Sequence, residues 1–109
     1  MKKVARLLLA SALVVSFSAT AMAGAKERGK KLYIQKTCHT CHGPKGKAAI
    51  PTYPSLGGQN KQYLINQIKD IKSGKRKNGM TMLMKANPFV QKLTKKEIKD
   101  ISTYLSKIK

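Results

Sequence analysis

The sequence of 109 residues has few of the residue types that build most metal and catalytic sites. It contains two cysteines and two histidines, and all four lie within the segment Cys38-His39-Thr40-Cys41-His42. Two thiols and two imidazoles so close together cannot surround one zinc ion tetrahedrally, and no distant Cys or His can complete a site. A disulfide between Cys38 and Cys41 would close too small a loop to constrain much of the chain.

Acidic residues are equally scarce, and no strand pattern is present. Four acidic residues stand against 23 basic ones, which gives a formal net charge of +19. The absence of parallel-strand runs argues against a thioredoxin-like dithiol, because that motif follows a strand. Such a charge suggests nucleic-acid binding, but the sequence has no nucleic-acid motif and no stripe of aromatic and basic residues.

The motif that remains is Cys-x-x-Cys-His, the attachment signature of c-type haem. Its two thiols add to the two vinyl groups of the porphyrin, and one helical turn presents both sulfurs along one haem edge. The adjacent imidazole then points at the iron as the proximal ligand. The sequence therefore predicts one covalent haem c, bound through Cys38, Cys41 and His42.

The N-terminus has the three parts of a secretory signal peptide. A basic segment (residues 1–6) precedes an apolar stretch (residues 7–17), and the small-residue site Ala21-Met22-Ala23 follows. The apolar stretch is shorter than the ~20 residues of a membrane-spanning helix. We therefore expect residues 1–23 to be cleaved, residues 24–109 to form one domain in the periplasm, and the net charge to fall by three, to +16.

Three helices are predicted in the mature chain. The first covers residues 25–35, the second runs from Lys61 to about Ser73 between Asn60 and Gly74, and the third follows a capping box that begins at Thr94. Residues 43–58 and 74–92 are predicted as loops. The expected apolar faces are Leu32 and Tyr33, with Ile34 as a further candidate, then Tyr63, Leu64, Gln67, Ile68 and Ile71, then Ile98, Ile101, Tyr104, Leu105 and Ile108.

The second face of the iron needs a ligand from elsewhere in the chain. His39 lies inside the attachment loop and cannot reach round, so a methionine thioether is the soft ligand that remains. Cleavage removes the methionines of the signal peptide and leaves Met80, Met82 and Met84, all in the loop after the second helix. Core filling is the ordinary role of methionine, and it would account for one or two of the three.

The mature chain resembles the class I c-type cytochromes, especially the small bacterial monohaem proteins and the single domains of di-haem relatives. The resemblance rests on the haem motif, on Gly-Lys-Lys-Leu-Tyr at residues 29–33, on Tyr104 and on residues 53–59. It implies an all-α, small cytochrome c-like fold with about three main helices packed around one haem. In that family a glycine at the position of Gly29 lets the first and last helices cross closely.

The resemblance also implies two further site residues. Pro54 lies at the family's position for a backbone carbonyl that accepts a hydrogen bond from the imidazole Nδ1 of His42. Met84 follows Arg76 at the family's usual distance for the distal ligand, although its distance to Leu93 is about two residues longer than usual. The expected haem-binding set is Cys38, Cys41, His42, Pro54 and Met84, with His42 and Met84 on the iron and Met80 and Met82 as alternatives.

These features predict a periplasmic one-electron carrier and not an enzyme, because two axial ligands close the iron to substrates. The alternatives are a haem subunit of a larger redox complex and a haem enzyme or sensor with an open sixth position. We expect a monomer whose redox partners have acidic docking surfaces, with peripheral contact to an anionic membrane surface and no binding of nucleic acid. Lys36, Lys45, Lys47 and Lys85 flank the site in sequence and are expected around the haem edge.

Overall fold

The computed structural model describes residues 24–109, and the expected signal peptide lies outside them. Residues 24–35 are helical, and α2 (His39–His42), α3 (Lys61–Ser73), α4 (Thr81–Ala86), α5 (Pro88–Gln91) and α6 (Lys95–Ser106) follow. No strand occurs in this part of the chain, so the predicted all-α architecture is confirmed. None of the helices between residues 24 and 109 is long and apolar enough to cross a membrane.

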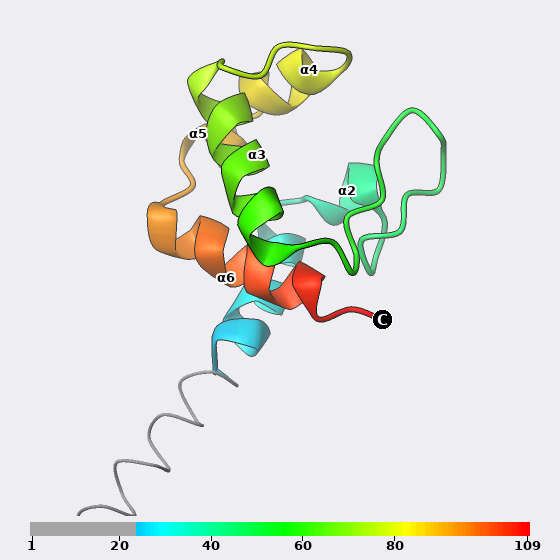
Figure 1. Ribbon diagram of the computed structural model, residues 1–109, viewed down its shortest axis with the longest axis vertical. Coiled ribbons are helices and arrows are strands. Elements are labelled where there is room, and N and C mark those ends of the chain that lie inside the picture. The colour runs from blue at the N-terminus through cyan, green and yellow to red at the C-terminus, as the bar shows by residue number, and fades with distance from the viewer. Residues whose placement is uncertain (1–23) are drawn as a thin grey trace, which may run out of the picture.

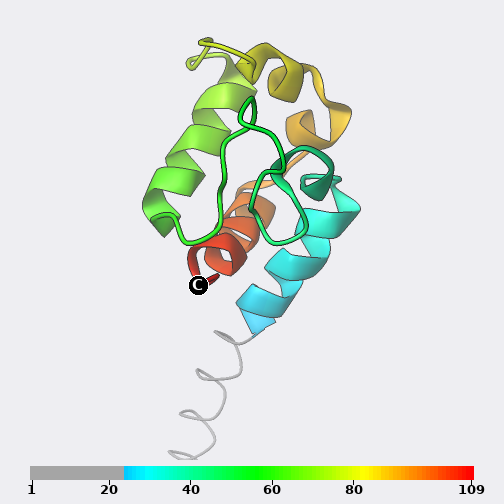
Figure 2. The ribbon, with the colours of Figure 1, turned by 90° about the vertical axis from the view of Figure 1, so that its right-hand side faces the viewer.

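The helices enclose a space on one side of α3 and α6. The helix of residues 24–35 and α3 both pack against α6, while α4 packs on α3 and α5 at the C-terminal end of α3 (Figure 1). The long loop between α2 and α3 runs in front of α6 when the molecule is viewed from the side (Figure 2). The loop, α2 and the segment that contains α4 and α5 therefore lie close together although they are far apart in the chain.

Side-chain caps fix the limits of the two long internal helices. The side chain of Asn60 accepts a hydrogen bond from the Tyr63 N–H, and α3 ends at Gly74, which adopts the left-handed conformation with φ of 84°. In α6 the Thr94 hydroxyl accepts from the Glu97 N–H, and the Glu97 carboxylate accepts from the Thr94 N–H. Both predicted starts are confirmed.

The segment of residues 74–92, predicted as a loop, contains two short helices. The Asn87 side chain accepts from the Phe89 N–H and Pro88 occupies the first turn of α5, which is a regular helix start. The loop prediction was wrong here because the helix start formed by Asn87 and Pro88 was not recognised. By contrast, α4 has no side-chain cap that the sequence could reveal.

The first helix crosses α6 at Gly29. A β-carbon at this position would lie 1.9 Å from the carbonyl oxygen of Asp100 and 2.8 Å from Cβ of Tyr104. The Arg28 Nε lies 3.0 Å from Oδ2 of Asp100 beside the crossing, and the rings of Tyr33 and Tyr104 are 5.7 Å apart. The close crossing implied by the family resemblance is present.

One buried cluster joins the helices, and it matches the predicted faces only in part. Ile34 is exposed, Tyr63 is half exposed, and Ile65, which the predicted stripe omits, is buried. Met84 and Cys38 are partly buried and pack against this cluster. Its members are Tyr33, Leu64, Ile65, Ile68, Leu93, Ile98, Ile101, Tyr104 and Leu105.

Candidate functional site

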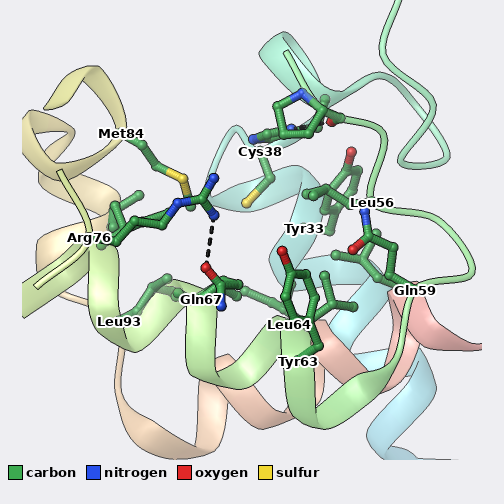
Figure 3. A pocket seen from close by; sticks show the side chains of 17 residues that line it. Tyr33, Cys38, Leu56, Gln59, Tyr63, Leu64, Gln67, Arg76, Met84 and Leu93 are labelled. Atoms are coloured by element: carbon green, nitrogen blue, oxygen red, sulfur yellow. Dashed lines mark hydrogen bonds between the residues drawn. The ribbon is translucent and has the colours of Figure 1, made fainter. Parts of the chain in front are cut away.

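Two adjoining hollows lie between α2, α3 and the segment that contains α4 and α5. Their volumes are about 120 Å³ and about 420 Å³, and the smaller one is enclosed mainly by apolar side chains of α3, α5 and α6. Figure 3 shows the smaller one, with side chains entering from both sides. The residues that line both hollows are Cys38, His42, Pro54, Ile71, Arg76, Met84 and Val90. Four of these seven were predicted as site residues from the sequence.

The two thiols lie at the edge of this space. Cys38 is partly buried and lines both hollows, whereas Cys41 is exposed and lines only the larger one. Burial raises the pKa of the Cys38 thiol to about 11, so this thiol is neutral at physiological pH. The single turn of α2 places both sulfurs beside the same cavity, as attachment to one porphyrin edge requires.

A hydrogen bond orients the imidazole of His42. Its Nδ1 lies 2.9 Å from the carbonyl oxygen of Pro54, and a carbonyl can only accept, so Nδ1 carries the proton. Nε2 is then the nitrogen with a free lone pair, the form in which imidazole binds a metal ion. The hydrogen bond expected from the family resemblance is present, and His42 lines both hollows.

The segment that follows His42 is hydrogen-bonded to Tyr33 of the first helix. The Tyr33 hydroxyl donates a hydrogen bond of 2.5 Å to the carbonyl oxygen of Gly43, and its burial raises the pKa of the phenol above the ordinary range. Gly43 has φ of 86°, and a β-carbon there would lie 1.9 Å from the Lys47 carbonyl oxygen. The residue after the imidazole is therefore fixed in a conformation that only glycine adopts easily.

The three candidate methionines occupy different positions. Met84 is partly buried, packs on the core and lines both hollows. Met80 is 45% exposed and lines only the larger hollow, while Met82 is 53% exposed and lines neither. In Figure 3 the side chains of Met84 and Cys38 enter the cavity from opposite sides.

Arg76 lines both hollows, although it was not predicted as a site residue. Its Nη1 donates to Oε1 of Gln67 over 2.9 Å, the dashed line in Figure 3, and its Nε donates to Oδ1 of Asn78 over 2.9 Å. The guanidinium therefore lies in a largely apolar space with amide partners and no carboxylate. No sequence signal distinguishes Arg76 from its neighbours Lys75 and Lys77 in the same basic run.

Of the four lysines expected around the haem edge, one lines a hollow. Lys36 lines the larger hollow, whereas Lys45, Lys47 and Lys85 line neither. The Lys85 ammonium lies over Gly74 at the end of α3. Within residues 24–109, Lys36 and Arg76 are the Lys and Arg side chains of the cavity walls, and no Asp or Glu lines them.

Comparison with known proteins agrees with this arrangement. A family model described as cytochrome c matches residues 26–109. Cytochrome c-554(548) of Halomonas halodenitrificans is 43% identical over 70 residues, which cover 64% of this chain and 82% of that protein. Cytochrome c4 of Thiocapsa roseopersicina is 34% identical over 67 residues, which cover 62% of this chain and 32% of that protein.

A similar structure has also been solved. The crystal structure of reduced recombinant cytochrome c4 from Pseudomonas stutzeri matches with a TM-score of 0.65 and 26% identity, over 80% of this chain and 50% of that one. The chain thus spans most of the Halomonas protein but only a third to a half of the cytochrome c4 chains.

Proposed function

The chain belongs to the cytochrome c family, and we propose that it is an exported single-haem electron carrier whose iron lies between His42 and Met84. Family membership makes it an electron-carrying c-type cytochrome that binds haem c covalently, with Cys38 and Cys41 in the attachment motif. The two axial ligands, the periplasmic location and the nature of the partners are the proposed part.

The residues of the cavity fit haem c. The wall is mainly apolar, as a flat apolar porphyrin requires, and both thiols lie beside it. When bound, haem c supplies an iron that gains and loses one electron. An imidazole with a free Nε2 and a soft thioether are suitable ligands for this iron, and His42 and Met84 provide them.

The protein's own groups hold and tune this site. The carbonyl of Pro54 fixes the ring orientation of His42 and strengthens its Nε2 as a donor. The Met84 thioether would hold the iron together with His42, and would so exclude water and small ligands. Arg76 places a positive charge in a cavity of low dielectric, where it disfavours the additional charge of ferric iron and raises the reduction potential.

The observation that carries the proposal is the lining of the cavity: among the three candidate methionines, Met84 lines both hollows together with the oriented imidazole of His42. An absorption spectrum of the purified protein, oxidised and reduced, tests it together with the intact mass after acid–acetone extraction. We expect one haem retained on the chain and a low-spin ferric spectrum with the weak red band of Met–Fe(III).

The spectrum, the intact mass and a sedimentation experiment distinguish this proposal from the alternatives. A high-spin ferric spectrum would indicate an open sixth position and hence an enzyme or a sensor. Haem released into the solvent would contradict attachment through both cysteines. A sedimentation profile that does not change with concentration is expected for a free carrier, whereas a stable complex with another redox protein would favour a dedicated subunit.

Export and partner chemistry follow from the rest of the sequence. The N-terminal segment has the three parts of a signal peptide, and the remaining chain has a net charge of +16, three below the +19 of the full sequence. A charge of this sign attracts acidic proteins and speeds their encounter at low ionic strength. We therefore propose a periplasmic carrier that exchanges electrons with acidic redox proteins, and N-terminal sequencing of the purified protein should begin at Gly24.

A further inference from the structure

We propose that Gln91 and Lys72 are positioning residues that hold the segment carrying Met84 against the end of α3. The inference rests on the proposed role of Met84 as the distal ligand. It concerns the two short helices that the sequence did not reveal, because Gln91 is the last residue of α5 and Met84 lies in α4.

The side-chain amide of Gln91 joins two helices. Its Nε2 lies 2.8 Å from the carbonyl oxygen of Lys85, the neighbour of Met84, and 3.2 Å from the carbonyl oxygen of Lys72 in the last turn of α3. A primary amide has two N–H groups, so it can donate to both oxygens. Both carbonyls belong to helix ends, where they have no partner within their own helix.

Lys72 makes the second connection between the same segments. Its ammonium donates a hydrogen bond of 2.6 Å to the carbonyl oxygen of Leu93, just beyond α5. This bond is partly buried, and a charged donor makes it stronger than a neutral one. Lys72 therefore binds the segment twice, by its backbone oxygen at Gln91 and by its side chain at Leu93.

Besides its packing on α3 and α5, α4 has few anchors: Met84 packs on the core, and the Thr81 hydroxyl donates a hydrogen bond of 2.8 Å to the carbonyl oxygen of Asn78. The helix α4 has no side-chain cap and no buried residue, and Met82 and Leu83 on it are more than half exposed. Its neighbour α5 is anchored by Val90, which is buried and lines both hollows. Gln91 follows Val90, and its hydrogen bond to the Lys85 carbonyl joins α4 to this buried anchor. Gln91 thereby keeps the Met84 thioether at the iron.

The test uses imidazole binding to the ferric holoprotein, because imidazole takes the sixth position only when the methionine leaves. Gln91→Leu removes both donors and keeps a side chain of similar size. We expect the imidazole binding rate to rise about threefold to tenfold, as the loss of one or two modest hydrogen bonds implies. In global urea unfolding, followed by circular dichroism, the protein should be destabilised by no more than the same free energy, because both openings break the same hydrogen bonds.

Two matched controls separate positioning from general stability. Gln62 also donates an exposed amide hydrogen bond, but to Asn66 within α3, so Gln62→Leu should leave the imidazole rate unchanged. Lys72→Met should raise the rate, whereas Lys69→Met, an exposed neighbour on the same helix, should not. An imidazole rate for Gln91→Leu within twofold of that for Gln62→Leu would overturn the inference.

Failure of the inference can be told apart from failure of the proposed ligand. If Met84→Ala keeps the red Met–Fe(III) band, the ligand proposal is wrong and the positioning role falls with it. If Met84→Ala removes the band while Gln91→Leu and Gln62→Leu bind imidazole equally fast, only the positioning role is wrong.

Discussion

Met80 and Met84 lie four residues apart at α4, yet only Met84 reaches the core and lines both hollows. Residues at this spacing lie on the same face of a helix. The difference is depth, because Met80 precedes the helix and remains 45% exposed. One thioether therefore packs on the core beside both hollows, and the other stays exposed beside the larger hollow.

This difference in depth gives the first prediction. Met84→Ala should abolish the red Met–Fe(III) band and open the iron to carbon monoxide in the reduced protein, because the interior thioether is lost. Met80→Ala and Met82→Ala are the matched controls and should keep the band. Absorption spectra and carbon monoxide titration measure both effects. Loss of the band in Met80→Ala alone would assign the ligand to Met80 and leave the fold unchanged.

The second prediction concerns the charge of the protein. Oxidation of the reduced protein by an anionic iron complex should slow about tenfold or more between 0.01 and 0.1 M salt, because the Debye length shrinks from about 30 Å to about 10 Å. A cationic oxidant should show the opposite trend. Stopped-flow rates at constant pH measure both. Rates that are indifferent to salt would mean that the charge does not steer encounter.

A third prediction compares the effect of Lys36, which lines the larger hollow, with that of a lysine that does not. Lys36→Gln and Lys45→Gln remove the same charge, but only Lys36 lines the larger hollow. We therefore expect Lys36→Gln to slow the anionic oxidant more than Lys45→Gln does, since a nearby charge acts more strongly than a distant one. Equal effects would show that only the net charge matters.

The capping box of α6 gives a prediction for pH. The pKa of Glu97 lies below its ordinary value of 4.5, chiefly because the carboxylate accepts a hydrogen bond from the Thr94 N–H, with Lys36 contributing. A lowered pKa in the folded state stabilises the fold above the ordinary pKa, and this contribution is lost as pH falls through the folded-state value. Glu97→Ala should cost about 0.5–1 kcal/mol at pH 7 and progressively less below pH 4.5.

Urea unfolding of the holoprotein at pH 3.5 and at pH 7 measures this difference in the cost of Glu97→Ala. Thr94→Ala is the control, because the loss of a hydroxyl cap costs about 1 kcal/mol without a titrating group. Its destabilisation should therefore depend less on pH than that of Glu97→Ala. A cost for Glu97→Ala that is the same at pH 3.5 and pH 7 would contradict the assignment.

The crossing of the first and last helices gives the final prediction. Gly29→Ala places a β-carbon against backbone atoms that cannot rotate away, so the helices must separate. A 1.9 Å approach to a backbone oxygen puts the cost at or above the upper end of about 1–3 kcal/mol, so it exceeds the helix-propensity gain of about 1 kcal/mol. At Gly24 a β-carbon meets only the end of the flexible Arg28 side chain, so Gly24→Ala should be nearly neutral in the same urea experiment.

Local chemistry explains which parts of the fold were predictable. The limits of α3 and α6 depend on side chains next to them in the sequence, such as Asn60 and Thr94, and the structure has them where predicted. The limits of α4 depend on packing against α3 and α5, which no local pattern contains. The face of α3 was only partly predicted because the helix has two apolar sides, one toward the cavity and one toward the core.

The residues of the site also divide into those set by local sequence and those set by contacts elsewhere in the chain. Cys38, Cys41 and His42 form one contiguous motif, and Pro54 lies twelve residues after His42 in the loop that follows the motif. The position of Arg76 depends on Gln67, an amide nine residues earlier that draws the guanidinium into the cavity. Such a long-range hydrogen bond leaves no signature in the sequence, so Arg76 was indistinguishable from a solvated surface cation.

The partly buried position of Cys38 bears on how the protein matures. Its sulfur lies beside the smaller hollow, whose wall α3, α5 and α6 form, and it also lines the larger one. A porphyrin is too large to pass between packed helices, so we expect the thioether bonds to form while the chain is still open. The helices would then close over a haem that is already attached.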